Sequence, residues 1–205
     1  MNSILLLATL LIPLSHAQAG IGADSVVAKL LTTKSEVTLN GTSVHAGDSL
    51  RQEGVLKTSA GGAARLELLP SHTILMVGAA SEIQLKRAGA DGTETTTLNS
   101  GLLRAQVQKK PSATKPVFFI RTSSAVMGVR GTDFLGIATP FLGESEIVVF
   151  SGAVDFSSAQ VPTDVKTVNP GFWGGIGGRF GSQTHELIHL PESALKHFQD
   201  ASEVK

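Results

Sequence analysis

The residues best suited to chemistry form the stretch HELIH, His185 to His189. It matches H-E-x-x-H, in which two histidines one helical turn apart bind Zn²⁺ and the glutamate polarises a metal-bound water. That pattern requires a helix, but Pro191 follows closely and a glycine-rich segment precedes it, and both disfavour a helix. On a strand, His185 and His189 would share a face but lie too far apart to chelate one ion. We therefore predict an edge strand or loop here, with a small zinc hydrolase using His185, Glu186 and His189 as the alternative.

Arg130 interrupts an apolar run, SAVMGVRGTDFLGI, at residues 124–137. Gly128 and Gly131 flank it, as expected where a strand bends or another backbone comes close. We predict a structural arginine, at least half buried, that binds backbone carbonyls or the carboxylate of Asp133 or Asp155. The alternative is an exposed Arg130 that binds an anionic ligand.

Two further groups of residues could contact a partner. Phe172 and Trp173 stand beside Gly and Pro and form either an exposed aromatic contact or a cover over the core. Lys109, Lys110 and Lys115 lie in the polar segment 109–116, where a solvated hairpin loop is the simpler interpretation than a contact with an acidic partner.

The elements that would position these residues are mostly strands. Apolar and polar residues alternate in short runs, for example ARLELLP and GLLRAQVQ, and turn residues separate the runs at intervals of 8–12 residues. Asn40-Gly41 and Asp91-Gly92 are hairpin signals because these residues tolerate positive φ. We predict an all-β fold of many short strands, an elongated β-solenoid or a sandwich-like domain. Residues 191–205 carry the one good helix signal, since Pro191 suits a first helical turn.

Composition limits the classes of function. The 205 residues include 17 Lys and Arg and 17 Asp and Glu, so the chain has no net positive charge that would favour binding to nucleic acid. Cysteine is absent, which leaves stability to the core and excludes a thiol nucleophile. The apolar residues 4–14 precede Ala17 and Ala19 in an A-x-A pattern, which predicts a signal peptide at 1–19 and a periplasmic or secreted product, with an uncleaved N-terminal anchor or a buried strand as the alternatives. No later segment is apolar for long enough to span a membrane.

Several segments together resemble the FecR domain family. FFIRTSSAVMGVRGTDF followed by SEIVVFSGAVDF is similar to its central signature, "V-[RA]-G-T-x-F" and then "x-G-x-V". The earlier GDSL, LKT and LNSGLLRAQV match the start of the family pattern in order and spacing. The signature positions are Gly128, Val129, Arg130, Gly131, Thr132, Phe134, Gly152 and Val154.

The resemblance implies a periplasmic, non-enzymatic β domain that senses or relays signals in the cell envelope, without cofactors or catalytic residues. Its founding type is the periplasmic part of an anti-sigma regulator. Here we expect a free-standing exported module that binds or scaffolds an envelope protein or cell-wall component, or a structural envelope protein, and not nucleic acid. The predicted parts are a signal peptide (1–19), a lead-in (20–35), the FecR-like domain (36–170), a Gly-rich loop with the last strand (171–190) and a helical tail (191–205).

Overall fold

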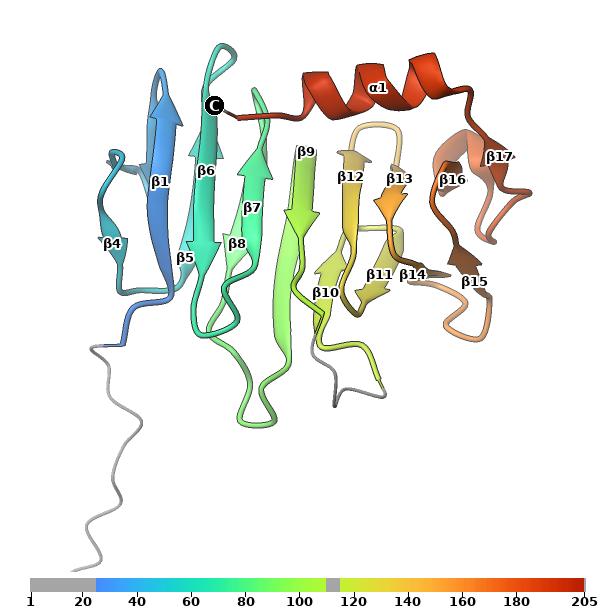
Figure 1. Cartoon of the computed structure of the whole chain (residues 1–205), viewed down its shortest axis with the longest axis horizontal. Coiled ribbons are helices and arrows are strands. Elements are labelled where there is room, and N and C mark those ends of the chain that lie inside the picture. Colours follow the sequence, from blue (N-terminus) through green and yellow to red (C-terminus); the bar gives the residue numbers. More distant parts are fainter. Residues whose placement is uncertain (1–24, 110–114, 205) are drawn as a thin grey trace, which may run out of the picture.

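A computed structural model describes residues 25–109 and 115–204. The predicted signal peptide at 1–19 therefore lies outside the described residues, as does Lys110. The regular elements of the described chain are all strands except one helix, α1 (Glu192–Ala201), and one short 3₁₀ turn, η1 (Gly178–Phe180) (Figure 1). The all-β prediction and the short C-terminal helix are confirmed, with Pro191 as the N-cap residue of α1 rather than part of its first turn.

The strands form two layers. In spatial order, sheet A contains β4 (Ser49–Leu50), β1 (Ala28–Lys34), β6 (Ala63–Leu68), β7 (Ile74–Val77), β9 (Glu94–Gln106), β12 (Asp133–Thr139), β13 (Glu144–Ser151), β16 (Phe172–Ile176) and β17 (Ile188–His189). Sheet B contains β3 (Thr42–Ser43), β2 (Val37–Leu39), β5 (Gly54–Thr58), β8 (Glu82–Leu85), the first part of β9, β10 (Phe118–Arg121), β11 (Ala125–Val129), β14 (Val154–Ser158) and β15 (Val165–Val168). The pairings are antiparallel except that of β9 with β10, which is parallel.

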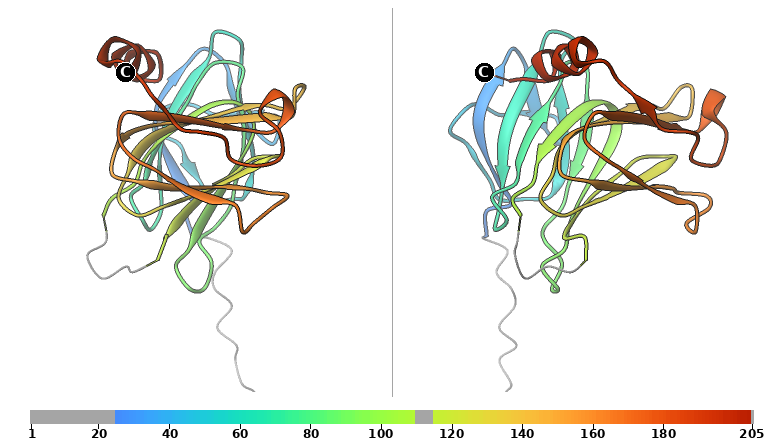
Figure 2. Two further views of the ribbon diagram at one scale, coloured as in Figure 1. Left: turned by 90° about the vertical axis from the view of Figure 1, so that its right-hand side faces the viewer. Right: turned by 45° about the vertical axis from the view of Figure 1, so that its right-hand side comes forward.

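The chain advances along the long axis by switching layers. It builds the hairpin β6–β7 in sheet A, continues through β8 and β9, and then places β10–β11 in B, β12–β13 in A and β14–β15 in B (Figure 1). Viewed along that axis, the two layers face each other and α1 lies outside sheet A (Figure 2). The molecule thus combines a sandwich-like cross-section with a solenoid-like progression.

One apolar cluster fills the space between the layers. The cluster takes residues from both sheets, for example Leu66 and Phe134 from sheet A and Leu56 and Phe156 from sheet B, all fully buried. The alternation of apolar and polar residues in the sequence explains this directly, because alternate side chains of a strand point to one face.

Two boundaries differ from the predictions. The lead-in at 20–35 was expected to precede the domain, but β1 within it belongs to sheet A and buries Ala28 and Leu30. A bulge between Leu30 and Thr32 breaks its register with β6, so a strict period of two is absent there. The Gly-rich segment after 170 was expected to be a loop, but Phe172–Ile176 is strand β16. Its glycines serve close packing, since a Cβ at Gly175 would lie 2.9 Å from the Phe180 ring.

Candidate functional site

The signature residues build two of the places where the chain crosses between the layers. β11 in sheet B leads through Arg130 and Gly131 to β12 in sheet A, and β13 returns through Gly152 to β14 in sheet B. The two crossovers touch: a Cβ on Gly152 would lie 2.5 Å from the carbonyl oxygen of Gly131. Both glycines have positive φ, +75° and +78°, which other residues adopt only with strain.

The remaining signature residues hold these crossovers to the core. Val129, Phe134 and Val154 are buried between the sheets. The Thr132 hydroxyl donates to the carbonyl of Ala153 at 3.0 Å, and its backbone pairs with Val107. The family pattern therefore coincides with a stacked pair of crossovers that packs against the core.

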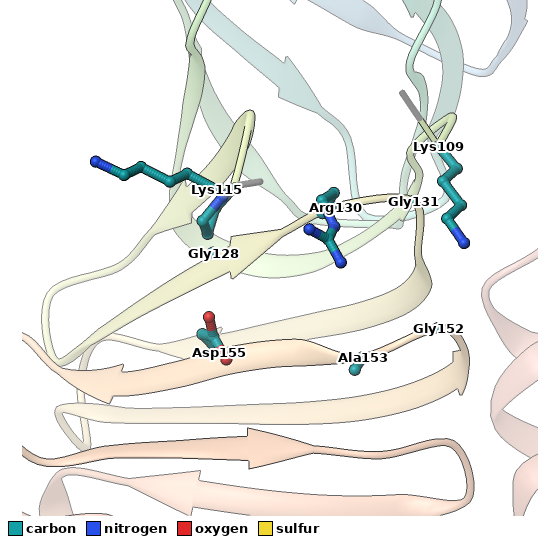
Figure 3. Close-up of a pocket in the computed structure, with 9 residues that line it drawn as sticks. Lys109, Lys115, Gly128, Arg130, Gly131, Gly152, Ala153 and Asp155 are labelled. Carbon is teal, nitrogen blue, oxygen red and sulfur yellow. The ribbon is translucent and has the colours of Figure 1, made fainter. Parts of the chain in front are cut away.

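Above these crossovers lies an open cleft of about 420 Å³, lined by Lys109, Lys115, Pro116, Gly128, Arg130, Gly131, Gly152, Ala153 and Asp155 (Figure 3). Arg130 extends from the crossover into the space above Ala153 and Asp155, while Lys109 and Lys115 stand on opposite sides. The lining carries three cationic side chains and one carboxylate.

Arg130 lies at the surface and is exposed, yet it also interacts with other groups of the protein. Val129 and Thr132 point inward at the crossover, which leaves the Arg130 side chain on the outer side. Asp133, one of the two carboxylates expected to bind Arg130, pairs with Arg104. Asp155, the other, lines the same cleft as Arg130 and accepts a hydrogen bond from the Thr167 hydroxyl at 3.1 Å.

The HELIH segment is not helical. Residues 184–187 are irregular, and Ile188–His189 form strand β17 at the edge of sheet A, paired with β16. The predicted edge strand or loop is confirmed, and the zinc-hydrolase alternative loses the helix on which its geometry depends. The His189 ring packs edge-on against Phe172 at 5.1 Å between centroids.

Phe172 and Trp173 have different surroundings. Phe172 is half buried and packs against the core. Trp173, also half buried, donates from Nε1 to Glu146 at 2.8 Å and contacts the Phe180 ring edge-on at 5.3 Å between centroids. The Arg179 guanidinium lies over Phe180, 4.7 Å from its centroid.

A neighbouring hairpin extends this surface. The turn between β12 and β13 presents Phe141, 96% exposed, and Leu142, 48% exposed. Its backbone packs against η1, because a Cβ on Gly178 would lie 2.3 Å from the Leu142 oxygen. We call the set Phe141, Leu142, Trp173, Arg179 and Phe180 the aromatic end.

Sequence reasoning missed the buried charge network around Arg104. This residue is 6% exposed, and its Nε and Nη2 each donate to Asp133 at 2.8 Å. These hydrogen bonds raise the arginine pKa above its usual value. Alternation placed Arg104 on a polar face, but its partner lies 29 residues away and only the pairing of β9 with β12 brings the two together.

Comparison with known proteins agrees with this architecture. The family model described as FecR protein matches residues 54–155, from β5 to the start of β14. Two crystal structures of a proposed anti-sigma factor from Parabacteroides distasonis share the fold, with TM-scores of 0.60 and 0.58 and 16% identity in both cases. The alignments cover 72% and 71% of this chain and 65% and 64% of those chains. No curated protein matches.

The matched region contains the stacked crossovers and every signature residue from Gly128 to Val154. Residues 54–155 are a FecR domain, and the chain is a FecR domain-containing protein.

Proposed function

We propose that this chain is a non-catalytic regulatory module that is exported to the cell envelope and acts there by binding another protein. The FecR domain supports a regulatory role, and the proposed anti-sigma factors with the same fold are regulators by description. The apolar segment at 4–14 and the A-x-A pattern support export. Among the described residues, no helix is long and apolar enough to cross a membrane.

The observation that carries the proposal is the aromatic end. Phe141 is almost fully exposed and adds nothing to the core. Trp173, Phe180 and Arg179 lie on the adjacent β16 and η1, and aromatic residues with arginine are the types enriched at binding hot spots.

The residues of the aromatic end are also held in place in the free protein, so little conformational entropy would be lost when a partner binds. Glu144, only 4% exposed, accepts from the backbone N–H of Arg179 at 3.1 Å and lies 3.5 Å from its Nε. The turn itself is closed by bonds from Leu142 to Thr139 and from Gly143 to Pro140.

Cross-linking in intact cells tests the proposal. A photoreactive amino acid at Leu142 of the full-length chain should yield a defined protein adduct in the envelope fraction. Phe141→Ser should abolish that adduct without changing the thermal unfolding midpoint, because the Phe141 side chain is 96% exposed. Val165→Ser, at a half-exposed position on β15 of the other sheet, is the matched control and should leave the adduct intact. An adduct that survives Phe141→Ser would contradict the proposal.

A further inference from the structure

The outer face of sheet A carries a second apolar layer under α1. Cross-strand pairing places Met76, Arg104, Leu135, Val148 and Trp173 in one row across β7, β9, β12, β13 and β16. Directly paired residues share a face, and the Arg104 guanidinium reaches α1, so this row faces the helix. Met76, Leu135 and Val148 are at most 2% exposed yet lie outside the cluster between the sheets.

The sheet itself orients Arg104 beneath the helix. Asp133 binds it through two oxygens, Gln106 donates to the same carboxylate at 3.2 Å, and the Phe150 ring lies 4.9 Å from the guanidinium carbon. Only Nη1 reaches the C-terminal segment, where it donates to the Gln199 carbonyl at 3.2 Å and to the Glu203 carboxylate at 3.1 Å. A bidentate carboxylate contact fixes a guanidinium in one orientation, so the sheet presents a preformed cationic group to whatever lies above it.

The helix itself, in contrast, contributes little buried surface, although Ser202 and Val204 just beyond it are buried. None of the ten residues of α1 is buried, and its inward side chains, Ala194, Leu195 and Phe198, are only half buried. A hollow of about 560 Å³ remains where the chain after Asp200 meets the turns next to β6 and β7. A helix of this length is marginal on its own in water, so it depends on contact with the sheet.

We propose that the outer face of sheet A is a docking surface for an amphipathic helix that presents a carboxylate to Arg104. α1 is its resident occupant, and a partner helix of the same pattern displaces it. The residues of this surface define what the partner helix must carry. It needs an apolar stripe that contacts Met76, Leu135 and Val148, and an acidic side chain about one turn beyond that stripe. Of the aromatic end, only Trp173 belongs to this row, and no experiment on either surface substitutes it, so this proposal and the proposed function can fail independently.

Hydrogen exchange on the unmodified full-length chain gives the first test. We expect the amides of α1 to exchange at least a hundredfold faster than those of β12 and β13, because the helix opens without the sheets. Equal rates in α1 and in the sheets would mean that the helix opens only on global unfolding, and would overturn the proposal.

Competition by a peptide gives the second test. The probe is a fluorescent synthetic peptide of residues 190–204, added to the full-length double variant Leu195→Ser/Phe198→Ser, whose own helix is weakened. It should bind this variant at least tenfold more tightly than the wild-type chain, where the resident helix competes at high effective concentration. A Glu203→Gln peptide should bind about fivefold more weakly because it lacks the charged acceptor, whereas Lys196→Gln, at an exposed position on α1, should not differ.

Two results would overturn the proposal in this assay. One is equal binding of the probe to the variant and the wild type. The other is a dimer of the double variant in sedimentation, which would assign the surface to a second copy of the chain. If the double variant does not fold, the exchange measurement on the wild type decides the question alone.

Discussion

Gly152→Ala tests whether the signature glycines exist to let the two crossovers touch. Gly152 has a φ of +78°, and an added Cβ would lie 2.5 Å from the Gly131 oxygen and 3.0 Å from the Thr132 Cα. The left-handed conformation costs an alanine about 1–2 kcal/mol, and displacing a packed backbone costs a further ~1–3 kcal/mol. We therefore expect the free energy of unfolding to fall by about 2–5 kcal/mol.

Gly41→Ala separates these two contributions. Gly41 has nearly the same φ, +79°, but nothing lies within 4 Å of its Cβ position, so only the conformational cost of about 1–2 kcal/mol applies. Urea denaturation followed by the fluorescence of Trp173 measures both variants. If Gly152→Ala loses no more stability than Gly41→Ala, the close approach of the crossovers is not the reason for the glycine.

Three further predictions concern polar contacts. Arg104→Met should lower the free energy of unfolding by about 2–4 kcal/mol because it leaves a carboxylate unpaired, and adding Asp133→Leu should restore most of the loss in the same urea assay. Hydrogen bonds from the backbone and hydroxyl of Thr184 lower the pKa of Asp164, so its contribution to stability is present above about pH 4 and is lost as the pH falls through the lower pKa of the folded state. Urea titrations between about pH 2 and 7 should therefore show a smaller acid-induced loss in Asp164→Asn than in the wild type. Phe134→Ala should cost about 3–5 kcal/mol of unfolding free energy, since Phe134 is fully buried between the layers; a loss below 1 kcal/mol by calorimetry would argue against that packing.

Local patterns predicted the fold class well and the exposure of single residues less well. Asn40-Gly41 forms the expected turn between β2 and β3, with positive φ at both residues, because turn chemistry is a local property. Whether Arg130 is buried depends on which side of a crossover the chain leaves free, and that follows from packing of the two layers.

The contacts around the candidate surfaces needed the tertiary structure for the same reason. Arg104 lies beside Asp133 because the register of β9 and β12 pairs Arg104 with Leu135. The sequence of either strand alone does not determine that register. The residues around Phe141 form an ordinary turn sequence, so no local pattern predicts that its side chain is almost completely exposed.

Strand β9 has a consequence for assembly. Residues 94–97 pair with β10, residues 97–100 pair with β8, and residues 101–106 pair with β12 on one side and in part with β7 on the other. A slip of one residue turns every side chain of a strand to the opposite face, so a misplaced β9 would bring Arg104 into the core and expel Leu103. Four neighbours in two layers would then lose their partners together. The placement of β9 therefore fixes the register of four neighbouring strands in both layers at once.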